Sequence, residues 1–265
     1  MPDDSTSTTS TTASTTAPTT ASRELSPEPP TRPLQAFEVV LSWVDDRVLG
    51  GELTVGDHLP PERELARLLE VSRAAVREAV RTLQAQGVVR SVVGAGAAAG
   101  TVITAVPTRA LTRLLRLHVA LANFPLPDVI EVRIALERLS ARLAARHATK
   151  DDLATMRGLL DTMADPDIDR LRFNDCDTDF HVAVAAAAGN RLATDLTVAI
   201  RESMRLPILD RFRHVHDWDD VVDGLRKDHE AIHAAIAAGK ADDAEQLVEA
   251  HIRSAWQTIN PATSS

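Results

Sequence analysis

The sequence predicts a mainly α-helical protein with two folded domains, a small N-terminal one that includes a β-hairpin and an all-α C-terminal bundle of six or seven helices. Apolar residues recur at helical spacing through most of the chain after residue 34. Runs of β-branched residues occur around 88–104 and are nearly absent from residue 109 onward. The length of 265 residues and the apolar content of 44% can supply a core to each of two modest domains.

Residues 1 to about 30 form a Ser/Thr-rich tail that we expect to be disordered. The first 22 residues contain 14 Ser or Thr and no Lys or Arg, so they cannot bury enough surface to offset the entropy of ordering. The tail lacks the basic and apolar regions of a secretory signal, and no later stretch is apolar enough to cross a bilayer. The single cysteine, Cys176, fits a reducing compartment. We therefore expect a soluble, cytoplasmic protein without a membrane partner.

The domain predicted at residues 34–105 begins with three helices. The first carries an apolar stripe and ends near Gly50–Gly51, the stripe being Phe37, Val40, Leu41, Val44 and Val48. The second extends from Pro60 to Leu69 and opens with proline and acidic residues, as a helix N-terminus should. The third occupies 73–86, with Ser72 as its predicted N-cap.

The third helix has two different faces, and a hairpin follows it. Val76, Ala79, Val80 and Leu83 would be buried, whereas Arg73, Arg77 and Arg81 recur every fourth residue on another face. β-branched runs at 88–93 and 101–104 flank a tip of Gly and Ala and predict the hairpin. Two short helices joined by a three-residue turn, with a hairpin behind, predict a winged helix-turn-helix.

The arginine row has an ordinary alternative, a solvated helix face, which is the better interpretation for an isolated helix. Within a winged helix-turn-helix it instead predicts a recognition helix, because guanidinium groups reach guanine edges and phosphates in the major groove. The net charge of -9 excludes a histone-like, charge-driven binder, so DNA contact must be confined to one local face.

The N-terminal motifs resemble the GntR family of bacterial regulators. The resemblance covers about 70 residues through Leu59-Pro60-Pro61-Glu62-Arg63-Glu64-Leu65-Ala66, Val71-Ser72-Arg73, Val76-Arg77-Glu78-Ala79 and Leu83-Gln84-Ala85-Gln86-Gly87. It implies that Arg63, Arg73 and Arg77 contact the operator, and Arg81 is our extension of that set. The Gly/Ala wing tip departs from the family pattern, which leaves the contribution of the wing to specificity open.

Residues 108–258 predict a helical domain with acidic and imidazole side chains on its buried faces. Seven helices are expected near 109–122, 127–147, 150–163, 168–188, 190–213, 217–238 and 240–257. On the fourth of them Asp177 and His181 share a face with Phe173, Phe180 and Val184. His229 and His251 also lie on apolar faces. Any one of these histidines alone would be a core or cap histidine, but the four together predict a divalent-metal site.

This half resembles the ligand domain of the FadR subfamily of GntR regulators, through Asp177-Thr178-Asp179-Phe180-His181, His229-Glu230-Ala231-Ile232 and His251. The resemblance implies that Asp177, His181, His229 and His251 bind the metal. We expect zinc, with nickel or another transition metal as alternatives. His233 is an alternative ligand, and His214 and His216 are expected on a loop.

Residues 131–137 resemble the subfamily's second ligand-domain helix, which implies that Arg133 holds the carboxylate of an effector. The alternative is a structural Arg133–Glu137 ion pair. The predicted function is a homodimeric regulator that binds a palindromic operator in double-stranded DNA and responds to a small organic acid at the metal site. The alternatives are a metal-dependent hydrolase with an accessory domain and a regulator with a metal-free ligand site.

Overall fold

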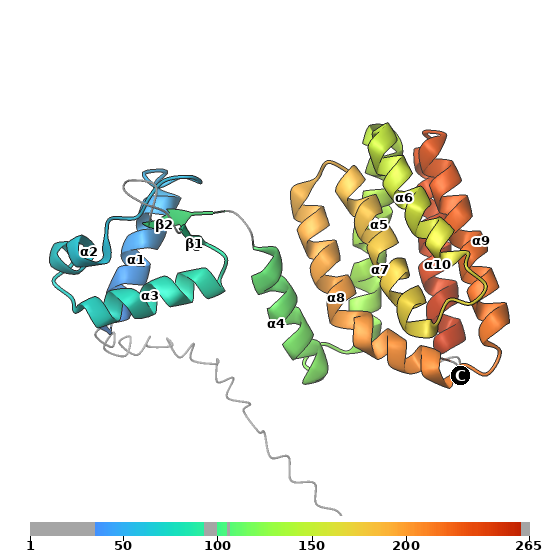
Figure 1. The fold of residues 1–265 in the computed structure, drawn as a ribbon, viewed down its shortest axis with the longest axis horizontal. Helices are drawn as coiled ribbons and strands as arrows, with labels where there is room; N and C mark the ends of the chain where they lie inside the picture. Colours follow the sequence, from blue (N-terminus) through green and yellow to red (C-terminus); the bar gives the residue numbers. More distant parts are fainter. Residues whose placement is uncertain (1–34, 93–99, 105–106, 261–265) are drawn as a thin grey trace, which may run out of the picture. The chain divides into compact units, whose positions relative to one another are not determined.

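The computed structural model describes residues 35–92, 100–104 and 107–260 (Figure 1). The predicted disordered tail and the Gly/Ala wing tip lie outside the described residues, apart from Gly100 at the end of the tip. Within the described ranges, no helix is both long enough and apolar enough to cross a membrane.

The N-terminal elements have the order that the sequence predicts. They are α1 (Ala36–Leu49), α2 (Glu62–Leu68), α3 (Arg73–Ala85), β1 (Val89–Val92) and β2 (Gly100–Ile103). The two strands pair antiparallel. Helix α1 ends where predicted, and Gly51 there adopts a φ of 74°, a left-handed conformation that glycine tolerates better than other residues.

Two clusters of buried side chains hold these elements together. Val40 packs with Leu65, Val76 and further residues of α2 and α3, and Val44 packs with Leu83 and the two strands. The predicted stripe of α1 is wrong at its last member, because Val48 is 37% exposed. Val48 lies in the final turn of α1, and neither cluster includes it.

Helix α3 begins with a side-chain cap. The backbone N–H of Ala75 donates to Ser72 Oγ at 3.1 Å, which satisfies one of the amides that a helix N-terminus leaves without an intrahelical partner. Gly87 follows the helix with a φ of 74°. Both ends of α3 are therefore set by the local residues that the sequence indicated.

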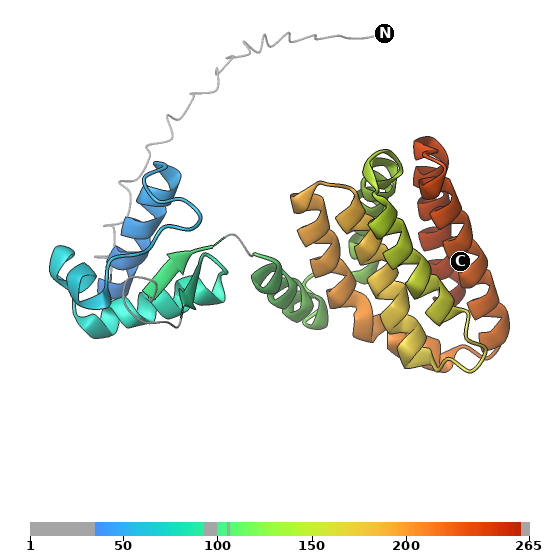
Figure 2. The same cartoon turned by 45° about the horizontal axis from the view of Figure 1, so that its top comes forward.

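The C-terminal part of the described chain is a bundle of helices that share one core (Figures 1 and 2). Its helices agree with the seven predicted ranges to within two residues: α4 (Thr108–Ala120), α5 (Leu126–His147), α6 (Lys150–Met163), α7 (Arg170–Ala187), α8 (Arg191–His214), α9 (Trp218–Ala237) and α10 (Ala241–Ile259).

Helix α5 has the central position in this bundle, since it packs against α7, α8, α9 and α10. The helix has 22 residues, and one side of it is buried along its length, as shown by Ile130, Ile134, Ala141 and Ala144. Polar residues of α5 that fall on the same buried side therefore face the helices around it. Those residues include Arg133 and Glu137, which are 6% and 2% exposed.

Candidate functional site

The four predicted DNA-contacting arginines all lie on the surface of α2 and α3. Arg63, Arg73, Arg77 and Arg81 are exposed. Among the described residues, none of their guanidinium groups has a hydrogen bond or an ion pair. In contrast, Arg47 on α1 lies 3.7 Å from Glu52 and 3.9 Å above the ring of Trp43. The guanidinium groups of α2 and α3 are free to contact phosphates or base edges.

The four predicted metal ligands come together inside the bundle. Asp177 and His181 are one turn apart on α7, His229 comes from α9, and His251 comes from α10. All four are buried, and one potential ligand atom from each lies within 4.8 Å of the others. Sequence periodicity had placed each side chain on an apolar face, and the packing of α7, α9 and α10 makes those faces converge.

Two carboxylates orient two of the imidazole rings. His181 Nδ1 is 2.6 Å from Glu137 Oε2, and His251 Nδ1 is 3.2 Å from Asp228 Oδ2. A ring that donates from Nδ1 keeps the lone pair on Nε2 available. His229 Nε2 lies 3.1 Å from Asp177 Oδ1 but lacks the geometry of a hydrogen bond.

A fully buried arginine balances the negative charges of the carboxylates in this centre. Arg201 on α8 is 1% exposed. It donates from Nε and Nη2 to the two carboxylate oxygens of Glu137 at 2.7 and 2.9 Å, and from Nη1 to Asp177 Oδ2 at 3.0 Å. Such bidentate, charge-assisted bonds fix both the position and the ionisation of a carboxylate.

The pKa values follow from this arrangement. Burial alone would raise the pKa of Asp177 and of Glu137, but the nearby Arg201 guanidinium and histidines hold both pKa values well below the usual range. Burial and the positive charge of Arg201 lower the pKa of His181 well below 6.5. Burial and the neighbouring His229 lower the pKa of His251 to about 4. At neutral pH the carboxylates are ionised, and His181 and His251 are neutral.

These residues fit a divalent transition metal. His181 Nε2 and both ring nitrogens of His229 are buried and have no hydrogen-bond partner among the described residues, a state that normally costs stability. Nitrogen lone pairs without donors, together with an ionised carboxylate, are what a metal ion requires. Three imidazoles and one carboxylate match the donors that zinc and nickel accept.

Of the two arrangements that the sequence left open for Arg133, the structure contains the ion pair. Arg133 Nε donates to Glu137 Oε1 at 2.7 Å, so the structural ion pair is formed. Arg133 also lines a small cavity together with Asp177 and His251. It is therefore held by Glu137 at a position that borders the Asp177, His181, His229 and His251 cluster.

The remaining candidate histidines stay outside the cluster. His233 is partly buried and lies 3.1 Å from Arg157 Nη2 and 3.2 Å from the carbonyl oxygen of Leu153. His216 is in the loop after α8, as expected. His214 was expected on that loop, but it is the last residue of α8, which extends one residue beyond the predicted end.

Sequence reasoning missed Arg201 and Asp228. A signal for Arg201 was present, because it occupies a position of the buried stripe of α8, between Thr197 and Met204. An arginine on such a stripe requires buried acidic partners. Asp228 gave no such signal, since it immediately precedes His229 and its side chain is 44% exposed.

Comparison with known proteins agrees with both halves of this description. Residues 38–98 match the model of bacterial regulatory proteins of the gntR family, and residues 128–254 match the FCD domain. The HTH-type transcriptional regulator LutR of Bacillus subtilis (strain 168) is 31% identical over 207 residues, which cover 77% of this chain and 92% of that protein. The chain belongs to the GntR family of transcription regulators and carries a C-terminal FCD domain.

Two further relatives illustrate the range of the family. The putative L-lactate dehydrogenase operon regulatory protein of Escherichia coli (strain K12) is 29% identical over 202 residues, 76% of this chain and 77% of that protein. The solved structure of Streptococcus agalactiae GntR has 24% identity and a TM-score of 0.50 over 83% of this chain and 98% of that one, which supports the fold. These relatives are named as regulators, so the hydrolase alternative is set aside.

Proposed function

We propose that this DNA-binding regulator acts as a homodimer, with residues 34–105 as the operator-binding domain and residues 108–258 as a sensor for a small carboxylate. The observation that carries the proposal is the burial of four metal-binding side chains beside Arg133. Two copies would present two recognition helices to the two halves of a palindromic operator. Effector binding would favour one packing of the sensor helices and so change operator affinity.

The exposed arginines of α2 and α3 support the assignment of the DNA face. Arg73→Ala should weaken specific operator binding by about 1–3 kcal/mol without changing the fold. Fluorescence anisotropy with a labelled operator measures this loss. Arg47→Ala is the matched control, since the Arg47 side chain already contacts Glu52 and the ring of Trp43. Equal operator affinity of the two variants would contradict the assignment.

The buried imidazoles with unpartnered nitrogens support the assignment of the metal centre. A bound divalent cation would act as a Lewis acid that grips a carboxylate. His181→Ala should lose bound metal in elemental analysis and lose the response of operator binding to effector. His233→Ala is the matched control, because His233 is a partly buried histidine outside the cluster. Full metal content in His181→Ala would show that the ligand set is wrong.

Arg133 supports a carboxylate as the effector. A guanidinium that borders the metal centre can bind one carboxylate bidentately. The name of one relative refers to the operon of a dehydrogenase for L-lactate, itself a small carboxylate. Arg133→Lys should retain metal and lose most of the effector response, because lysine cannot reproduce the bidentate geometry. If the purified protein contains no metal and binds acids equally well with a chelator present, the sensor is a metal-free one.

A further inference from the structure

The walls of the cavity beside the metal centre restrict which acids can fill it. The cavity has a volume of about 20 Å³, and its charged or imidazole side chains are Arg133, Asp177 and His251, all at the metal end. The rest of the lining is apolar or aromatic: Ile208, Phe212, Leu225, Ala255, Trp256 and Ile259. One end of a ligand would therefore meet charges, and the other end would meet hydrocarbon.

The apolar wall disfavours a second polar group on the ligand. Phe212, Leu225 and Ile259 are 3%, 5% and 9% exposed, so a carboxylate or hydroxyl group placed against them would lose its hydration without gaining a hydrogen bond. The other buried cation nearby is not available for a second carboxylate, because Arg201 donates to Glu137 and Asp177.

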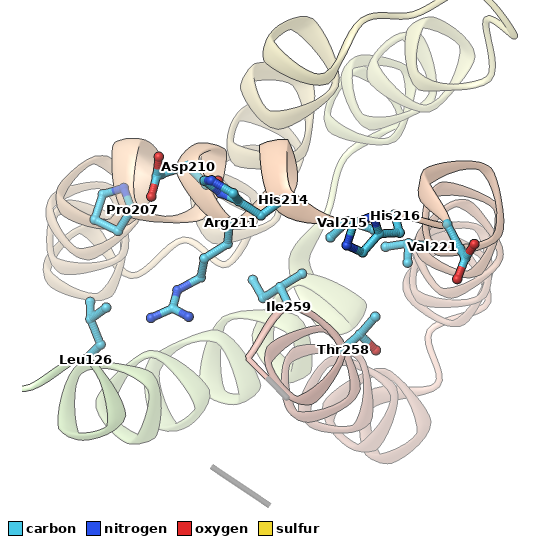
Figure 3. Close-up of a pocket in the computed structure, with 11 residues that line it drawn as sticks. Leu126, Pro207, Asp210, Arg211, His214, Val215, His216, Val221, Thr258 and Ile259 are labelled. Atoms are coloured by element: carbon cyan, nitrogen blue, oxygen red, sulfur yellow. The ribbon is translucent and has the colours of Figure 1, made fainter. Parts of the chain in front are cut away.

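Ile259 separates the small cavity from larger ones. A volume of about 20 Å³ admits roughly one water molecule, so a ligand can enter only if part of the wall moves. Ile259, the last residue of α10, also lines neighbouring cavities of about 710 and 260 Å³. Figure 3 shows it on the α10 side of the cavity of about 710 Å³, facing α8. Displacement of this one side chain would join the metal centre to that space, whose walls include the charged side chains of Asp210, Arg211 and Asp228, so an apolar tail has to end near Ile259.

We propose that the effector is a monocarboxylate with an apolar tail, which packs against Phe212, Trp256 and Ile259, and that Ile259 limits the length of the tail. The inference rests on the proposed function, since it assumes that the carboxylate binds between the metal and Arg133. Short dicarboxylates and polyhydroxy acids are the excluded classes.

The proposed apolar tail can be tested by calorimetric titration of the zinc-loaded full chain with two series of acids. One series is the straight-chain monocarboxylates from acetate to octanoate, with their 2-hydroxy derivatives as probes that offer a second oxygen. The other contains glutarate, malate and gluconate. Affinity should rise roughly three- to fourfold with each added methylene group until the tail fills the space. Pentanoate should bind more tightly than glutarate, which differs from it by a terminal carboxylate.

Two variants test whether Ile259 sets the preferred chain length. Ile259→Ala should move the preferred chain length upward by roughly three carbons, the number that the substitution removes. Leu206→Ala on α8, where Leu206 is 67% exposed, should leave the series unchanged. Equal zinc content and equal melting temperature of each variant and the parent protein show that the centre is intact.

The outcomes separate this inference from the proposed function. Tighter binding of glutarate, malate or gluconate than of pentanoate overturns the apolar-tail inference and leaves a carboxylate sensor in place. Failure of every acid in both series to bind the zinc-loaded chain overturns the sensor as well. An unchanged chain-length preference in Ile259→Ala overturns the assignment of Ile259 as the residue that limits the length of the tail.

Discussion

Arg201→Met is the substitution that most directly tests how the buried centre is held together. Methionine has a similar length and is apolar, so it removes the charge while filling much of the volume. Arg201 is 1% exposed and makes hydrogen bonds to Glu137 and Asp177, which are themselves 2% and 6% exposed. Loss of the guanidinium leaves two buried carboxylates with much less positive charge nearby to balance them.

The expected destabilisation is large. Removal of one partner from a buried ion pair costs about 3–5 kcal/mol, because the remaining charge stays desolvated. For a chain of this size each kcal/mol lowers the melting temperature by roughly 2–4 °C. The melting temperature of Arg201→Met should therefore fall by about 6–20 °C. Arg133 still binds Glu137, which places the loss toward the lower half of this range.

The assay is a thermal melt in excess chelator at pH 7.5, where no metal ion can offset the lost charge. Arg205→Met is the control, one turn further along α8. The Arg205 side chain is 30% exposed and pairs with Asp175 and Glu202. Loss of such a partly exposed pair should cost less than about 1 kcal/mol. Equal melting temperatures for the two variants would refute the account of Arg201 as the cation that compensates the centre.

Three further predictions concern other parts of the chain. Ser72→Ala should destabilise α3 by about 1 kcal/mol, since it removes the N-cap bond to Ala75, and a denaturant melt that shows no change would contradict this. Cys176 should react slowly with a thiol reagent in the native protein and fast in guanidinium, because burial raises the pKa of its thiol; rapid native reaction would contradict this. Zinc and a bound acid should each raise the affinity of the other, and an acid affinity that is the same with and without zinc in paired titrations would contradict a shared site.

The features that the sequence predicted are those that depend on nearby residues. The cap of α3 involves Ser72 and Ala75, three residues apart, and the exposed arginines of that helix follow from a spacing of four. The shared face of Asp177 and His181 likewise follows from one helical turn. Such features are set by local backbone geometry, which is why periodicity alone was enough to expect them.

The features that the sequence did not predict depend on how distant helices pack. Arg201 and Glu137 are 64 residues apart, and they meet because α5 packs against α8. The four side chains on apolar faces and the resemblance to a known subfamily both predicted a metal site, but the distances among these residues depend on how α7, α9 and α10 pack. Val48 shows the converse, since its spacing matches the stripe of α1 while the packing ends before it.

The charges of the centre support the proposal that a metal ion and an acid share one site. Arg133 and Arg201 carry two positive charges, Glu137 and Asp177 carry two negative ones, and the lowered pKa values of His181 and His251 keep these imidazoles neutral at pH 7. Asp228, with a side chain 44% exposed, is partly screened by water. The buried set is thus close to neutral before a divalent cation binds and carries an excess of two positive charges afterwards. In a buried environment such an excess would be costly, and the carboxylate of the proposed effector would reduce it.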